Sequence, residues 1–460
     1  MTEESLKKFQ NSANSGFYAH HLSKLSESGN RAYTTSDVVN DNGVLIARKG
    51  ITIDDDVRNR LLKHKLFQPL DTTIGLEQQA DSQTLIQEFR KLMDRYPDLQ
   101  QINTALEFGP EFEKLLKVER LHPVVTQKLT VLNSQMPSEF EKSIFTAWLS
   151  TMIAREIGLG AHDTRDTLVA ALIHDLGFLH LDPDIVCSNR KLTAEEWNTV
   201  RAHVIVGKII AESIPGISPE IPRAVIQHHE NCFGSGYPYA INADELGLPG
   251  RIIGMTDSIH SIRTKTLRGS GRTLGDIRPF LQLNPETQGH EVYRATMSII
   301  KKSDLKPLLF QPDYSPAEYA KLLGQKVEIL GEAKESLDNI HQGFSEINET
   351  KNTKKEIQTI LAITHRMRTT IHESGLLSHE LAAWLNQERD TGDIDVETLA
   401  ELNEVELLIK ELTWQMRNSV RMFQSHHHPE EIDSQEVSDY VAKSIVSIQD
   451  SFDRLNKIET

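Results

Sequence analysis

Residues 168–177 read LVAALIHDLG, an apolar stretch that runs directly into His174 and Asp175. An apolar run of this length predicts a buried helix, so both side chains are expected to emerge at its end, inside the protein. An adjacent histidine and aspartate offers one nitrogen ligand and one carboxylate that can bridge two metal ions. The question is which other segments complete such a site.

Three further segments carry the same kinds of side chain near predicted helix ends. His203 begins one apolar helix, His228 and His229 end another, and Asp257 closes the segment RIIGMTD. Neutral imidazole nitrogen and carboxylate oxygen are ligands of divalent Mn, Fe, Co and Zn. Two such ions roughly 3.5–4 Å apart can share a hydroxide and stabilise a phosphoryl transition state. The sequence therefore predicts a metal centre built from helix ends.

Other histidines are interpreted as solvent-exposed. The His162-Asp163 pair falls in a predicted helix–helix loop, and residues 426–428, three consecutive histidines, precede Pro429. Neither group is expected to bind the metal.

Two motifs give the predicted centre a family resemblance. HDLG at 174–177 resembles the HD-x-G opening of the HD superfamily of phosphohydrolases. HHENCFGSGYP at 228–238 resembles the HHE-xx-DG-x-GYP signature of its HD-GYP subfamily, with only the aspartate replaced. The resemblance covers residues 138–302. It implies an all-helical domain with a two- or three-metal centre that hydrolyses the bacterial messenger cyclic di-GMP to linear pGpG or GMP.

The resemblance also implies a ligand set. Asp175 would bridge, the other ligands of one ion would be His203, His228 and His229, and those of the second ion would be His174 and Asp257. We expect iron or manganese, as one or two ions, and the degenerate alternative below allows none.

Roles in catalysis and substrate binding are expected from neighbouring residues. His174 and Asp175 would take part in catalysis, and Glu230 would orient one of the metal-binding side chains without contacting the metal itself. Four residues are predicted to contact substrate: two glycines, whose backbone can approach a bound molecule closely, a tyrosine and a basic residue. These four residues are Gly234, Gly236, Tyr237 and Arg268.

Several positions depart from the HD-GYP pattern. Lys142 replaces an upstream histidine ligand, and an ammonium group has no lone pair for a metal while it is charged. It could instead act as a surrogate charge. Phe178 replaces the lysine of HD-x-GK, and Phe233 replaces the aspartate of the signature. Downstream, His260 replaces a second aspartate and an Arg-Pro-Tyr motif is missing.

These departures leave two functions open. One is a degenerate module with weak or no phosphodiesterase activity that senses a ligand or binds a partner. The other is an active metal-dependent cyclic di-GMP phosphodiesterase. A reaction on a different nucleotide and a purely structural role are further alternatives.

The flanking regions complete a mainly α fold with five predicted parts. A small β/α module at 1–75 contains a hairpin signal at Asn40-Asp41-Asn42-Gly43 and precedes a helical connector at 76–137. The HD-GYP-like domain at 138–302 is followed by a proline-rich linker at 303–316. Residues 317–460 are helical, with an a/d-like seam at Leu323, Leu330, Leu337 and Phe344. A second long helix is expected from Lys355 to about Gln387. We expect a helical bundle; a coiled coil that forms a homodimer or binds a protein partner is the alternative.

Composition excludes several classes of protein. The formal charge of −16 disfavours non-specific binding to nucleic acid or anionic lipid. No run of 18 apolar residues exists, so no membrane span is expected. Two cysteines and a polar N-terminus indicate a cytoplasmic protein.

Overall fold

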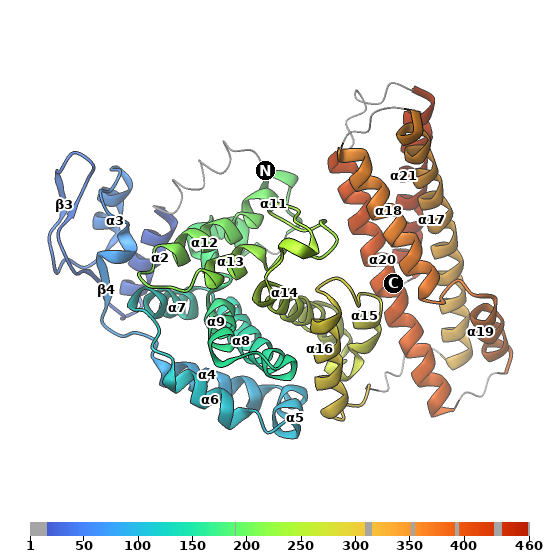
Figure 1. Cartoon of the computed structure of the whole chain (residues 1–460), viewed down its shortest axis with the longest axis horizontal. Helices are drawn as coiled ribbons and strands as arrows, with labels where there is room; N and C mark the ends of the chain where they lie inside the picture. The colour runs from blue at the N-terminus through green and yellow to red at the C-terminus, as the bar shows by residue number, and fades with distance from the viewer. Residues whose placement is uncertain are drawn as a thin grey trace. The chain divides into compact units, whose positions relative to one another are not determined.

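The structure is a computed structural model that confirms a mainly α fold (Figure 1). It describes residues 16–188, 190–308, 315–350, 355–391, 395–426 and 435–458. For residues 347–350, 355–356, 359, 422–426 and 435–441 it describes the backbone only. In this part of the chain, no helix has the length and apolar character that crossing a bilayer requires. The second and third histidines of the 426–428 run lie outside the described residues.

The N-terminal module, residues 16–76, contains the predicted hairpin. Strand β2 (Val38–Val39) pairs antiparallel with β3 (Leu45–Ala47), and Gly43 of the connecting turn has a φ of +75°. A glycine, which has no Cβ, adopts this left-handed backbone conformation at little cost. The other elements are α2 (Gly16–Glu27), β1 (Ala32–Thr34), α3 (Asp55–Leu62), the short 3-10 helix η1 (Leu70–Thr72) and β4 (Ile74–Leu76).

Four helices connect this module to the centre of the chain. They are α4 (Ser82–Arg95), α5 (Pro97–Ala105), α6 (Gly109–Val118) and α7 (Pro123–Gln135). Prolines occupy the first turns of α5, α6 and α7, where their missing N–H groups cost nothing. The prolines therefore mark the starts of these three helices.

The central region is helical throughout its described residues. The apolar stretch before His174 forms α9 (Ala161–Ile173), which packs against α8 (Pro137–Ile157) and α14 (Leu248–Ser261) (Figure 1). The remaining elements are the 3-10 helix η2 (Leu176–His180), α10 (Pro183–Val186), α11 (Ala194–Arg201), α12 (His203–Glu212), α13 (Glu220–Gln227), the 3-10 helix η3 (Ala243–Glu245), a π-helical turn η4 (Ile262–Leu267) and α16 (His290–Lys302).

The chain divides into two compact units. One contains residues up to 266 and 286–305, and the other contains 267–285 and the residues from 306 onward. Segment 267–285 carries the short 3-10 helices η5 (Arg268–Ser270) and η6 (Leu274–Asp276) and the helix α15 (Arg278–Gln282). It packs with the C-terminal helices, because the buried Arg272 pairs with Glu406 at 2.5 Å and donates to the Asn403 carbonyl. The division into five parts stays a prediction.

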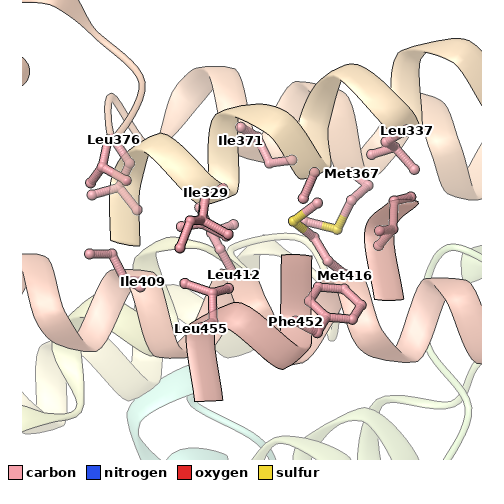
Figure 2. Close-up of a cluster of buried hydrophobic side chains, with 14 of the residues drawn as sticks. Ile329, Leu337, Met367, Ile371, Leu376, Ile409, Leu412, Met416, Phe452 and Leu455 are labelled. Carbon is pink, nitrogen blue, oxygen red and sulfur yellow. The ribbon is translucent and has the colours of Figure 1, made fainter. Parts of the chain in front are cut away.

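The C-terminal helices form a bundle with an apolar core. These helices are α17 (Pro316–Thr350), α18 (Lys355–Glu373), α19 (His379–Thr391), α20 (Val396–His426) and α21 (Gln435–Ile458). The predicted seam residues Leu323, Leu330, Leu337 and Phe344 are all buried in this core. Figure 2 shows Met367 of α18, Met416 of α20 and Phe452 of α21 pointing into one cluster.

One helix prediction in this unit is wrong. The sequence pattern indicated a single helix from Lys355 to about Gln387, whereas α18 ends at Glu373 and α19 begins at His379. Gly375 between them has a φ of +69°, a left-handed conformation that ends a helix.

Candidate metal centre

Helix ends bring the predicted ligands together within one compact unit. His174 caps the C-terminus of α9, and Asp175 caps the N-terminus of η2. His203 is the first residue of α12, while His228 caps the C-terminus of α13. Asp257 lies in the middle of α14. The predicted position at helix ends is therefore confirmed for the three histidines and Asp175 but is wrong for Asp257.

Three ligand atoms form a triangle of the size that one metal ion needs. The Nε2 atoms of His203 and His228 lie 3.3 Å apart, and Asp175 Oδ1 lies 3.3 Å and 3.8 Å from them. Ligands about 2.1 Å from a tetrahedral ion are roughly 3.4 Å from one another. Asp175 Oδ1 is buried and accepts no well-aligned hydrogen bond from any described residue. The three atoms therefore fit a single divalent ion placed between them.

The orientation of the imidazoles supports the same conclusion. Nδ1 of His203 donates to the Val200 carbonyl and Nδ1 of His228 donates to the Val225 carbonyl, each at 2.7 Å. A ring that donates through Nδ1 presents the lone pair of Nε2 on its other side when it is neutral. Burial and the neighbouring imidazoles hold the pKa of His228 well below its usual value, which keeps that ring neutral.

His229 completes this group on its more open side. A ring nitrogen of His229 lies within 4.8 Å of nitrogens of His203 and His228. Burial lowers the pKa of His229 to about 3, so this ring is also neutral. Its side chain is 23% exposed, whereas those of His203 and His228 are 1% and 0% exposed. A molecule from solvent would therefore reach the centre past His229.

Comparison with known proteins now adds the family. The HD domain family model matches residues 123–282. The central region is an HD domain of the HD-GYP type.

Curated relatives of this HD-GYP region are phosphodiesterases. The chain is 28% identical to 3'3'-cGAMP-specific phosphodiesterase 1 of Vibrio cholerae over 35% of this chain and 37% of the relative. It is 26% identical to a cyclic di-GMP phosphodiesterase of Thermotoga maritima over 43% of this chain and 53% of the relative. It is 30% identical to cyclic di-GMP phosphodiesterase PdeB of Borreliella burgdorferi over 26% of this chain and 31% of the relative. The chain thus spans about a third to a half of the length of these relatives.

The HD-GYP site departs from its pattern most sharply at Lys142. The Lys142 ammonium lies 2.8 Å from Asp175 Oδ2 and 2.5 Å from Asp257 Oδ1. Burial disfavours its charged form, but the carboxylates of Asp175 and Asp257 outweigh burial and raise the pKa of Lys142 well above its usual value. A fixed cation therefore lies between the two carboxylates that the resemblance gives to the second ion.

His174 joins Lys142 in this ion-pair network. Nδ1 of His174 donates to the Ala171 carbonyl at 2.8 Å, and Nε2 lies 3.0 Å from Asp175 Oδ2. Burial opposes the imidazolium, but the Asp175 carboxylate outweighs burial and raises the pKa of His174. Asp175 Oδ2 is thus contacted by both the Lys142 ammonium and the His174 ring, and Lys142 also contacts Asp257.

Phe178 and Tyr237 stack on two of the imidazoles. The Phe178 ring lies 4.2 Å from the His203 ring at an interplanar angle of 20°, and Tyr237 stacks on His229 at 4.6 Å and 20°. The Arg201 guanidinium lies over the outer face of this arrangement, 5.2 Å from the Tyr237 ring. The phenylalanine therefore fixes the plane of a ligand where the family has a lysine.

Glu230 holds the loop that follows the two histidines. Its carboxylate accepts hydrogen bonds from the backbone N–H groups of Tyr239, Ala240 and Ile241, at 2.7, 3.1 and 3.3 Å. These contacts orient the loop that carries Tyr237. The predicted catalytic role of Glu230 stays a prediction.

Two glycines permit the close packing around the ligands. A Cβ on Gly177 would lie 2.0 Å from the His203 carbonyl oxygen, so this glycine lets η2 touch the start of α12. A Cβ on Gly236 would lie 2.5 Å from the His229 carbonyl oxygen, so the loop folds back directly over the histidine pair. Gly234, by contrast, adopts a φ of +65° in the turn.

The other predicted residues have different surroundings. His162 and Asp163 lie in the first turn of α9, so their predicted place in a loop is wrong. Their side chains are 72% and 62% exposed, as expected for residues outside the centre. Arg268 is exposed and begins η5 of the second unit, and its contact with substrate stays a prediction. Sequence reasoning missed Glu139, one helical turn before Lys142 on α8. Burial raises the pKa of Glu139, and the charges of Asp175 and Asp257 act in the same direction against Lys142. The i, i+3 spacing to Lys142 is the signal that could have revealed it.

Proposed function

We propose that this chain is an HD-GYP module of bacterial cyclic di-GMP signalling that holds one divalent ion and binds a cyclic dinucleotide with weak or no hydrolysis. The observation that carries the proposal is the Lys142 ammonium between Asp175 and Asp257. In this role the module would sense its ligand or bind a protein partner.

The chemistry of an ammonium group supports loss of turnover. A second metal ion contributes a bound hydroxide and a Lewis acid at the phosphoryl group. Lys142 replaces the charge of such an ion but has no empty coordination position. It can neutralise carboxylates and attract a phosphate, but it cannot bind and deprotonate water as an ion does.

The remaining ligands support retention of one ion. His203, His228, His229 and Asp175 would hold it, with iron or manganese as the proposed metal. When bound, the ion would supply a positive charge and a Lewis acid for a phosphodiester oxygen. Tyr237 and Arg201 lie at the more open side, where an aromatic ring and a guanidinium suit a nucleobase and a phosphate.

The names of the relatives support the ligand class. Both cyclic di-GMP and 3'3'-cGAMP phosphodiesterases are among them. We place the protein in the cytoplasm, where these messengers act. We assign the C-terminal helices to a protein partner or to a second copy of the chain.

An active phosphodiesterase is the second candidate. It is favoured by the ligand triangle of Asp175, His203 and His228, which is spaced for an ion that could activate water by itself. Under this alternative Lys142 would stabilise negative charge on the substrate.

One set of measurements separates the two. Elemental analysis of the purified full-length chain gives the metal content, and parallel assays measure cyclic di-GMP binding and hydrolysis. We expect about one ion per chain, binding, and little or no linear product. Rapid hydrolysis would favour the enzyme, whereas a chain that takes up neither manganese nor iron would refute both candidates. The Lys142→His, Phe178→Lys, Phe233→Asp triple variant is expected to gain turnover.

A further inference from the structure

A fully buried lysine lies outside the metal centre. Lys128 of α7 is fully buried, and its ammonium forms an ion pair with Asp71 Oδ1 at 2.9 Å and donates to His180 Nε2 at 2.8 Å. The Tyr18 ring covers it, with the ammonium 3.8 Å from the ring centroid. An ammonium away from water requires such partners, because an uncompensated buried charge strongly destabilises a fold.

The partners of Lys128 come from distant parts of the sequence. Tyr18 and Asp71 belong to the N-terminal module, on α2 and η1. Tyr18 also stacks on His180, with ring centroids 4.9 Å apart and an interplanar angle of 10°, and its hydroxyl donates to Gln127 at 2.9 Å. Lys128 thus joins the N-terminal module to His180.

His180 belongs to the helix that begins at a metal ligand. It is the last residue of η2, and Asp175 is the N-cap of this five-residue helix. The Phe178 N–H donates to the Asp175 carbonyl at 3.0 Å, and the Phe178 side chain stacks on His203. A shift of His180 would therefore move Asp175 and the ring that fixes His203, because one short hydrogen-bonded helix carries all three.

We infer that Lys128 and His180 are positioning residues through which the N-terminal module sets the place of Asp175 in the metal centre. The inference rests on the proposed function in that Asp175 is taken as a metal ligand. The module then acts as an input element: a molecule that displaces α2 or η1 from Lys128 weakens the metal site. By thermodynamic linkage, metal binding tightens the packing of α2 and η1 to the same extent.

Hydrogen exchange on the wild-type full-length chain tests the coupling directly. Amide exchange is measured with and without Mn²⁺, and Mn²⁺ binding is followed by titration calorimetry. Exchange in α2 and η1 should slow by about fivefold or more on metal binding, whereas α6 serves as the control and should not change. Metal binding without any effect on α2 and η1 would overturn the inference.

Two variants separate positioning from simple destabilisation. Lys128→Met removes the ammonium that contacts Asp71 and His180. Ile53→Ala instead opens a cavity at a fully buried residue of the N-terminal module. Lys128→Met should weaken Mn²⁺ binding about tenfold, as loss of an outer-shell support does. Ile53→Ala should leave Mn²⁺ affinity unchanged although it lowers the melting temperature. Equal Mn²⁺ affinities in both variants would contradict a positioning role. If Lys128→Met does not fold, the wild-type exchange experiment decides.

Failure of the proposed function is visible separately. If the chain takes up no Mn²⁺, the single-ion function falls, but the coupling is still measurable through Asp175→Asn. Faster exchange in α2 and η1 of Asp175→Asn would support the coupling, and unchanged exchange would overturn it.

Discussion

The Nζ of Lys142 lies 2.5 Å from Oδ1 of Asp257, and this ion pair closes the metal centre on one side. Asp257 is a residue that the HD-GYP resemblance gives to a metal ion, and the Lys142 ammonium contacts its carboxylate. Burial opposes the charged carboxylate, but Lys142 and His229 outweigh burial and lower the pKa of Asp257. The carboxylate therefore stays ionised, with Lys142 as its permanent counter-charge.

Restoring a ligand at this position should change the metal content. Lys142→His supplies a neutral nitrogen between Asp175 and Asp257, so we expect the metal content to rise from about one ion per chain to about two. Elemental analysis after loading with Mn²⁺ measures this. Lys142→Met is the control, since it removes the charge without adding a ligand. An unchanged content in Lys142→His would argue against a second site held closed by the lysine.

Removing the Lys142 charge should destabilise the chain strongly. In Lys142→Met two buried carboxylates lose their cation, which costs about 3 kcal/mol or more of unfolding free energy at neutral pH. The comparison is Lys91→Met, which breaks an exposed pair with Glu88 and should cost less than about 1 kcal/mol. Denaturant unfolding in a chelator gives both values. Similar losses in the two variants would contradict a buried ion-pair network.

His260 should make stability fall in mild acid. Burial first, and then the Lys142 charge, lower the pKa of His260 to about 3. The unfolded chain binds a proton at His260 below about pH 6.5 and the folded chain does not, so unfolding free energy is lost as pH falls from 6.5 towards 3. At pH 5 this residue alone should account for about 2 kcal/mol, from 1.36 kcal/mol per pH unit.

The pH effect is measured as the difference in unfolding free energy between pH 7 and pH 5. His260→Gln should reduce this difference, whereas His162→Gln, at an exposed position, should leave it unchanged. An identical pH dependence in His260→Gln and wild type would refute the assignment.

Gly177→Ala should disrupt the metal centre through packing alone. The added Cβ would lie 2.0 Å from the His203 carbonyl oxygen and would push η2 away from α12. We expect a loss of about 3 kcal/mol in stability and weaker metal binding. Gly160→Ala is the matched control, because no atom lies within 4 Å of its Cβ position. Calorimetric unfolding with and without Mn²⁺ distinguishes the variants, and a Gly177→Ala protein with normal metal affinity would be inconsistent with this packing.

Glu230→Gln should loosen the loop without removing the metal. The amide oxygen can accept the two bonds now made to Oε1, but the NH₂ group would then face the Ile241 N–H, which now donates to Oε2. Faster hydrogen exchange across residues 237–241 and about tenfold weaker cyclic di-GMP binding are expected, with metal content unchanged. Loss of the metal in this variant would instead indicate a direct role for Glu230 at the ion.

Much of the fold could be predicted because its signals are local. The apolar run before His174, the Asn-Asp-Asn-Gly turn and the seven-residue spacing of Leu323, Leu330 and Leu337 each reflect a period or a turn preference within a few residues. The single helix predicted over 355–387 failed because Gly375 adopts a left-handed conformation that the surrounding helical period did not reveal.

For the candidate site, too, the local features could be predicted and the contacts between distant residues could not. By itself the sequence determined which side chains could bind a metal and that Lys142 cannot do so, because these are properties of residue types in a motif. Only the tertiary structure decided that the Lys142 ammonium lies between Asp175 and Asp257, and that Lys128 joins Tyr18 and Asp71 to His180. These contacts join residues from separate helices. That such residues lie close together in space cannot be read from their spacing along the chain.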